Sequence, residues 1–172
     1  KILFDSRDDS SLLVLRDAIS LIHQSEGKLI FVGNGASASL ASHAATDFTK
    51  QAKIPSIAFN DHNLITALSN DYGYENWVKK ALEFYANPSD LVIFISVSGE
   101  SINLLNGLDY ALEKSICTAS LTGASSLNSL KSKSKYSLWV NSKAYNIVES
   151  IHTIWITLII DLFVGSPEYS VS

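Results

Sequence analysis

The sequence contains one cysteine, Cys117, among its 172 residues. A disulfide needs two cysteines, so the chain has no disulfide framework, and a reducing cytoplasm is the compartment that we expect. Basic residues are also few, because Lys and Arg number 13 against 17 Asp and Glu and leave a formal net charge of −4. Binding to a nucleic-acid backbone needs concentrated positive charge, so this composition argues against a nucleic-acid partner. An anionic ligand would have to be held by local groups.

The sequence also lacks a long apolar run of the kind that spans a membrane. Its most apolar stretch, residues 151–164, is too short to span comfortably and contains His152 and Asp161. Residues 1–9 mix basic and acidic side chains instead of placing a basic start before an apolar run, so they do not predict a signal peptide. We therefore expect a cytoplasmic protein with no membrane partner.

Apolar residues make up 47% of the chain, as is typical of a single domain with a full core. Segments typical of strands alternate with segments of helical periodicity. The expected strands lie at 28–32, 56–60, 116–122 and 136–140, and a further strand begins at residue 91. This alternation predicts an α/β fold, with a five-stranded parallel sheet that is doubly wound with helices on both faces. We expect one domain over residues 1–172, with a leading helix in 1–26 and the α/β core plus a C-terminal helix in 27–165.

Two turns between a strand and a helix carry the first functional signal. In residues 91–103, an apolar run ends in Ser96, Ser98, Gly99 and Ser101 before a helix begins. Serine hydroxyls, close backbone approach at glycine and the positive end of a helix suit a phosphate group, although an ordinary capped turn has the same composition. Residues 28–39 repeat the pattern, and both turns should lie at the carboxyl edge of the sheet, where open α/β sheets bind ligands.

Two other segments suggest a ligand or a partner. The pattern of residues 61–68 predicts a short capped helix, followed at 69–73 by a polar turn that either faces the ligand or is a solvated loop. The last helix, expected at 145–163, is apolar over nearly its whole circumference. The other layers of one subunit cover only one side of such a helix, so we expect a second subunit to cover the rest.

In their order and spacing, six motifs resemble the sugar isomerase (SIS) domain, and within it the phosphoheptose isomerases. The motifs are Gly33-Asn34-Gly35-Ala36-Ser37, His43 through Asp47, Asn70-Asp71-Tyr72-Gly73, Ser96-Val97-Ser98-Gly99-Glu100-Ser101, Leu121-Thr122-Gly123 and Glu149-Ser150-Ile151-His152. The resemblance covers essentially the whole chain. It implies a homotetramer with sites at subunit interfaces and a leading helix involved in subunit packing.

The resemblance also implies an activity, the conversion of sedoheptulose 7-phosphate into D-glycero-manno-heptose 7-phosphate. No cofactor is required by the family as a whole, but some members bind zinc. The site residues that it implies fall into a phosphate group, a sugar group and a chemical group. They are, in that order, Ser96, Ser98 and Ser101; Asn34, Gly35, Ser37, Asn70 and Asp71; and His43, Asp47 and Glu149.

Ketose–aldose isomerisation needs a base that carries a proton between neighbouring carbons, and a second group that manages the oxygens. Asp47 and Glu149 are the candidate bases. His43 and Asp47 are four residues apart on one helix, which suits two metal ligands and equally suits an ordinary surface pair.

The chain departs from the family at the residues of the chemistry. Asp47 stands where the family has Glu, Glu149 where it has Gln, and Thr157 where it has its catalytic histidine. A Thr hydroxyl cannot take up a proton near neutral pH as an imidazole can. His152 matches an additional histidine of the family, and we expect it to be a core residue that is hydrogen-bonded to a neighbour.

Three functions are compatible with these residues. The first is a ketose–aldose isomerase with Asp47 or Glu149 as base, which the retained carboxylates favour. The second is a non-catalytic sugar-phosphate-binding adaptor, like the family members that bind the bacterial replication initiator, which Thr157 favours. The third is a metal-dependent variant in which His43, Asp47 and Glu149 bind zinc or a similar ion.

Overall fold

A parallel sheet of five strands forms the centre of the computed structural model, which describes residues 9–166. The strand order is β2-β1-β3-β4-β5, and all neighbours run parallel. The strands are β1 (Leu29–Gly33), β2 (Ser56–Ala58), β3 (Leu91–Ser96), β4 (Cys117–Thr122) and β5 (Tyr136–Trp139). The predicted five-stranded parallel α/β fold is thus confirmed. The predicted single domain over 1–172 extends beyond the described residues at both ends.

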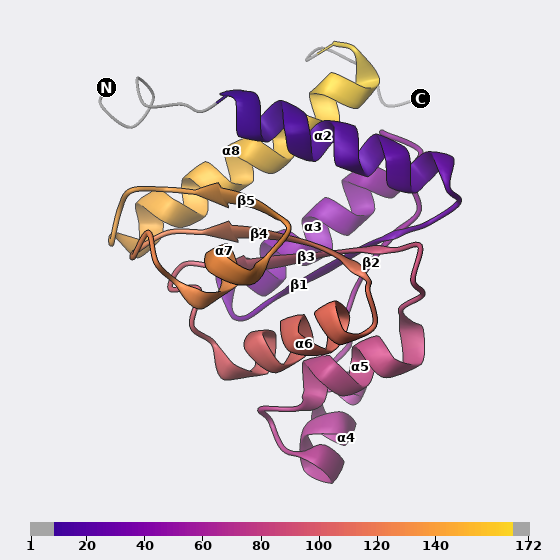
Figure 1. Cartoon of the computed structure of the whole chain (residues 1–172), viewed down its shortest axis with the longest axis vertical. Coiled ribbons are helices and arrows are strands. Elements are labelled where there is room, and N and C mark those ends of the chain that lie inside the picture. The colour runs from indigo at the N-terminus through magenta and orange to yellow at the C-terminus, as the bar shows by residue number, and fades with distance from the viewer. Residues whose placement is uncertain (1–8, 167–172) are drawn as a thin grey trace.

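Helices cover both faces of the sheet (Figure 1). One face carries α2 (Asp9–Gln24), α3 (Ala36–Lys50) and α8 (Tyr145–Val164). The other face carries α4 (His62–Tyr72), α5 (Trp77–Tyr85), α6 (Ile102–Glu113) and α7 (Ser129–Lys133). The predicted leading helix is described from residue 9 onward, and the rest of that prediction lies outside the described residues.

The central strands are buried on both sides, as expected for a parallel sheet between two helical layers. Leu29 and Phe31 of β1 pack toward α2, α3 and α8, whereas Ile30 and Val32 pack toward α5 and α6. Every residue of β1 and β3 is buried, which explains their continuous apolar sequences. Cys117, expected in the core, is only half-buried at the start of β4, and this burial raises the pKa of its thiol.

The predicted polar turn at 69–73 is wrong, because α4 continues through it to Tyr72. The Asp61 side chain caps the helix by accepting a hydrogen bond from the Leu64 N–H at 3.0 Å. Leu64 and Leu68 then lie on one apolar stripe that packs against the core, and this packing outweighs the turn-forming composition. The helix ends at Gly73, whose positive φ of 84° is costly for other residues.

A buried carboxylate joins the starts of β1 and β3. Asp90 is 1% exposed and accepts hydrogen bonds from the backbone N–H groups of Lys28 (3.0 Å) and Asn87 (2.8 Å). It also pairs with the Lys28 ammonium at 2.5 Å. This contact aligns the two strands whose opposite ends carry the two predicted binding turns.

Replacing Asp90 by Ala should lower the free energy of unfolding by about 3 kcal/mol, because it leaves buried donors without an acceptor. Asp109→Ala is the matched control, since Asp109 pairs with Lys133 at 2.7 Å on the exposed surface. The control should lose less than about 1 kcal/mol. Urea denaturation monitored by circular dichroism measures both variants, and equal losses would contradict a special role for Asp90.

Candidate functional site

The two predicted binding turns lie at the same edge of the sheet. β1 and β3 are neighbours, and Gly33 at the end of β1 pairs in register with Ile95, one residue before the end of β3. Ser96 in turn pairs with Thr122 at the end of β4. The turns that follow β1 and β3 therefore start side by side at the carboxyl edge of the sheet, the common ligand-binding position in open α/β folds.

The three serines of the second turn have different surroundings. Ser96 is buried, and its Oγ accepts a hydrogen bond from the Gly99 N–H at 3.1 Å. The Ser98 Oγ accepts one from the Glu100 N–H at 3.2 Å, and Ser101 is the N-cap of α6 without a capping side-chain bond. Ser96 thus shapes the turn, whereas the hydroxyl hydrogens of Ser98 and Ser101 can point to an anion at the start of α6.

Asn128 supports this turn from the beginning of α7. Gly99 has a positive φ of 71°, and a Cβ atom built on it would lie 2.0 Å from the Asn128 Oδ1. The Asn128 side chain is fully buried, accepts from the Lys131 N–H and donates to the Thr122 hydroxyl. This position therefore requires glycine both for its backbone conformation and for its close contact with Asn128.

A pair of amides connects the first turn to the second. The Asn34 Nδ2 donates to the Asn103 Oδ1, and the Asn103 Nδ2 donates back to the Asn34 Oδ1, each at 3.0 Å. The Tyr74 hydroxyl also donates to the Asn34 Oδ1 at 3.3 Å. Asn103 is buried in the first turn of α6, so this pair ties the glycine turn after β1 to the serine turn after β3.

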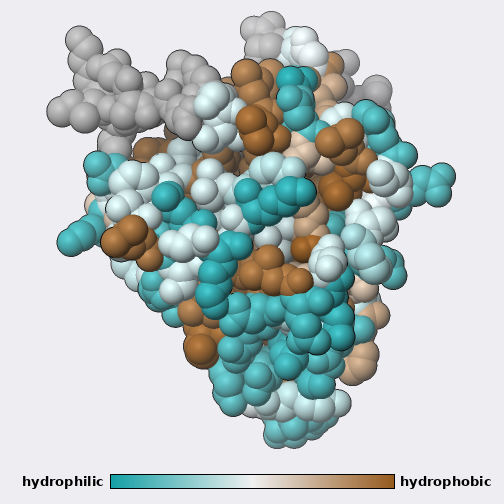
Figure 2. All heavy atoms as spheres, viewed as in Figure 1, coloured by the Kyte–Doolittle hydropathy of each residue, from teal (hydrophilic) through white to brown (hydrophobic). Residues whose placement is uncertain are grey.

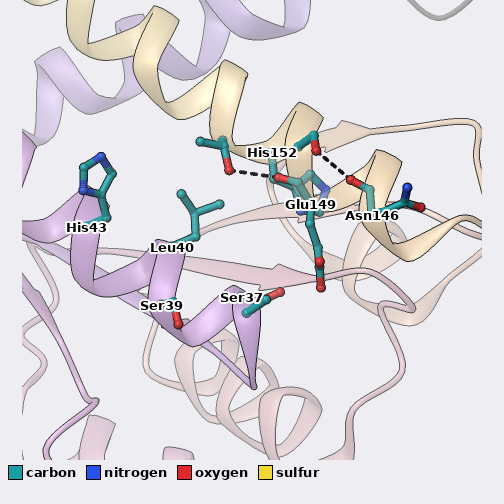
Figure 3. A pocket seen from close by; sticks show the side chains of 10 residues that line it. Ser37, Ser39, Leu40, His43, Asn146, Glu149 and His152 are labelled. Atoms are coloured by element: carbon teal, nitrogen blue, oxygen red, sulfur yellow. Dashed lines mark hydrogen bonds between the residues drawn. The ribbon is translucent and has the colours of Figure 1, made fainter.

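A pocket of about 450 Å³ opens between the start of α3 and the first half of α8. Its lining residues are Ala36, Ser37, Ser39, Leu40, His43, Asn146, Glu149, Ser150, His152 and Thr153. Figure 3 shows the Glu149 side chain extending from α8 toward Ser37 at the beginning of α3. The pocket thus brings three predicted site residues together: Ser37, His43 and Glu149.

The structure does not unite the predicted metal ligands within one chain. The His43 Nε2 lies 3.2 Å from the Asp47 Oδ2, but Asp47 does not line the pocket that contains Glu149. Among residues 9–166, no group of three or more His, Cys, Asp or Glu side chains is placed to hold a metal ion. His43, Asp47 and Glu149 therefore do not fit the expected zinc set in a single subunit.

Other predicted residues lie outside this pocket. Asn70 and Asp71 are exposed on α4, where the Asn70 Nδ2 donates to the Asp71 Oδ1 at 3.0 Å. Asn34 and Gly35 directly precede the pocket-lining start of α3. Thr157 is exposed, and its hydroxyl donates to the Thr153 carbonyl at 2.9 Å. Sugar binding by Asn70 and Asp71 stays a prediction.

His152 is the residue whose surroundings differ most from expectation. Its burial agrees with the predicted core position, but neither ring nitrogen has a hydrogen-bond partner among the described residues. Burial lowers its pKa to about 4, and the Thr122 backbone opposes this only weakly, without forming a hydrogen bond of acceptable geometry. The only signal in the sequence was its spacing of three residues from Glu149, which places both on one side of the helix.

Comparisons with known proteins agree on one family. The chain is 34% identical over 143 residues to the probable phosphoheptose isomerase of Thermoplasma volcanium, covering 80% of this chain and 72% of the relative. It is 35% identical over 127 residues to the phosphoheptose isomerase of Chlorobium phaeobacteroides, covering 69% of this chain but only 56% of that relative. The solved structure of phosphoheptose isomerase GmhA from Neisseria gonorrhoeae superposes with a TM-score of 0.84 at 24% identity, covering 90% of this chain and 86% of the other. No family model matches the chain.

The parallel sheet with a glycine turn and a serine turn at its carboxyl edge defines a phosphosugar isomerase of the SIS fold. Within this class, the chain belongs to the phosphoheptose isomerase family.

The buried His152 should make the protein less stable in acid. Its pKa is about 4 in the folded chain against an ordinary value of 6.5, so the unfolded chain binds a proton first as the pH falls. The His152 contribution is fully present above pH 6.5 and is lost progressively down to pH 4, by about 3 kcal/mol in total.

Denaturant unfolding of wild type and of His152→Phe at several pH values measures this effect. The difference in unfolding free energy between the two proteins should change over this acidic range. His62→Phe serves as the control, because His62 is exposed and its replacement should leave the wild-type pH dependence intact. Parallel curves for wild type and His152→Phe would contradict the assigned burial.

Proposed function

We propose that this chain interconverts a ketose phosphate and an aldose phosphate, with sedoheptulose 7-phosphate and D-glycero-manno-heptose 7-phosphate as the substrate pair. The observation that carries the proposal is the Glu149 carboxylate in a pocket beside the two binding turns. The pocket begins at Ser37, three residues after Asn34, and Asn34 is bonded to Asn103 at the start of α6. A phosphosugar that spans a few ångströms of this edge would contact both regions.

The serine turn supplies the phosphate end of the site. Ser98 and Ser101 offer hydroxyl hydrogens, and α6 adds the positive end of its dipole. The net charge of the chain is negative, so this local arrangement, and not a general positive field, has to attract the phosphate. Holding the phosphate fixes the distance of the sugar carbons from the base.

Glu149 is the better placed of the two candidate bases. It lines the pocket, and its carboxylate makes no hydrogen bond or ion pair with another described residue. Asp47 lies outside the pocket and is held by His43. Glu149 can therefore take the proton from the carbon next to the carbonyl and return it to the neighbouring carbon after the enediol forms. No step is assigned to a metal.

A sugar-phosphate-binding adaptor is the second candidate. It is favoured by Thr157, whose hydroxyl is bonded to the Thr153 carbonyl and cannot serve as an acid or base near neutral pH. The curated relatives compared above are named as isomerases, which supports the enzyme. An adaptor would bind the phosphosugar through the serine turn but would not exchange its carbon-bound protons with water.

Glu149→Gln should reduce the exchange of the substrate proton with deuterated solvent by about 100- to 10,000-fold, because it removes the base but keeps the size of the side chain. Nuclear magnetic resonance of sedoheptulose 7-phosphate in deuterated buffer measures this exchange. Asp161→Asn is the matched control, since it removes a carboxylate from the same helix outside the pocket, and it should keep the wild-type rate.

Two results would change the assignment. Full exchange in Glu149→Gln would exclude this residue as the base and would require Asp47→Asn to be inactive. A wild-type protein that binds five- to seven-carbon ketose phosphates, yet catalyses no exchange with any of them, would replace the isomerase with the adaptor.

We further propose that the chain assembles as a homotetramer through α2 and α8. Both helices expose large apolar side chains, including Val14 and Leu21 on α2 and Ile154 and Leu162 on α8. Figure 2 shows that apolar side chains gather mainly on the end of the molecule that carries these helices. By length and composition α8 could also cross a membrane, but it carries Asp161 and packs against α3 and α2, which favours a protein interface.

Light scattering should give about four times the chain mass of 18.8 kDa for wild type. The double variant Leu21→Glu, Ile154→Glu should dissociate, because it places charges in the proposed apolar contact. Leu127→Glu is the control, since Leu127 is 83% exposed on a loop away from both helices, and it should remain assembled. A monomeric wild type at micromolar concentration would contradict the proposal.

A further inference from the structure

His152 combines three features that are rarely found together. It is fully buried, it lines the pocket that contains Glu149, and both of its ring nitrogens lack a hydrogen-bond partner among the described residues. Buried polar atoms in folded proteins are almost always bonded, because an unpaired one carries a desolvation cost. The partner of this imidazole is therefore absent from the described part of the chain.

Packing alone does not explain a histidine at this position. The ring stacks on Trp155 with 5.8 Å between centroids and an interplanar angle of 28°, and it lies beside a small apolar cluster that includes Val148. A Phe side chain would make the same stack without two unpaired nitrogens. What the imidazole adds is the ability to hydrogen-bond to a molecule that enters the pocket.

We propose that His152 is a substrate-contacting residue, whose ring N–H donates a hydrogen bond to a carbonyl or hydroxyl oxygen of the bound phosphosugar. The inference rests on the proposed isomerase function of this pocket and names a second group for its chemistry. Glu149 lies three residues earlier on the same side of α8, in front of the ring in Figure 3. Because the Glu149 carboxylate has no partner to hold it, its rotation toward the substrate would open the ring to the pocket.

The electrostatic state of the ring suits this role. With a pKa of about 4, His152 is neutral near pH 7 and keeps one N–H donor. When Glu149 takes the proton from carbon, the electron pair moves to the carbonyl oxygen, and a neutral N–H beside that oxygen stabilises the charge. A neutral imidazole with a lowered pKa polarises the carbonyl in another aldose–ketose isomerase, triosephosphate isomerase. Thr157, which is exposed and bonded to Thr153, cannot provide this donor.

Nitrogen-15 spectra of the histidine rings test the contact without requiring turnover. The chain has four histidines, and the signals of His152 are assigned by their loss in His152→Gln. Adding sedoheptulose 7-phosphate should shift the His152 nitrogen signals, whereas inorganic phosphate, which fills only the serine turn, should not. The exposed His62 is the internal control and should not respond. A His152 signal that ignores the saturating sugar phosphate would overturn the proposal.

Kinetics and stability separate a functional histidine from a structural one. His152→Phe should lower kcat by about 100-fold, the usual effect of removing a donor from a developing oxyanion, with a smaller change in KM. Its melting temperature at neutral pH should stay the same or rise, because two unpaired buried nitrogens are removed. His152→Gln, which keeps an N–H donor, should recover part of the lost kcat.

Unchanged kcat in a folded His152→Phe protein would also overturn the proposal. If this variant does not fold, the partial activity of His152→Gln and the nitrogen-15 shifts in wild type still decide the question. A wild type that shows the shift but no turnover would keep the contact and reject the isomerase, so the two proposals fail by different results.

Discussion

The reciprocal hydrogen bonds between Asn34 and Asn103 are the contact on which the candidate site depends. β1 and β3 are adjacent, but register alone fixes only the ends of the strands and not the turns that follow them. The paired amides join the turn that leads into α3 to the first turn of α6. Because one end of this connection continues to Ser37 and the other follows Ser101, the pocket and the serine turn are held at a constant separation. A substrate with a phosphate at one end and reacting carbons at the other requires such a constant separation.

Most of the fold could be predicted, because its periodic signals are strong. The all-buried strands β1 and β3 and the apolar α8 follow from runs that only burial explains, and all five expected strands are found. The turn expected at 69–73 failed for a physical reason: Leu64 and Leu68 anchor one continuous helix, and tertiary packing outweighs the local preference of Asn70 and Asp71 for a turn. Residue composition reports local tendency, whereas the length of a helix also depends on what it packs against.

The site could be predicted only in part, because motifs identify residues but not their partners. Proximity of the two turns followed from sheet topology, and Ser37, His43 and Glu149 do share a pocket. The separation of Asp47 from Glu149 depends on how α3 and α8 cross, which no motif encodes. The surroundings of His152 were equally hidden, since a histidine bonded in the core and a histidine with two free nitrogens have the same letter in the sequence. Only the three-dimensional arrangement distinguishes them.

α8 links the chemistry of the site to assembly. Val148, His152 and Ile156 face the interior, whereas Ile147 and Ile154 on other sides of the same helix are exposed. If a second copy covers these exposed residues, as proposed, the contact also restrains the helix that carries Glu149 and His152. A shift of α8 by a fraction of a helical turn would move both side chains relative to Ser37, and small misplacements of catalytic groups have large effects on rate. The apolar circumference of α8 would then serve the geometry of the pocket as well as the stability of the assembly.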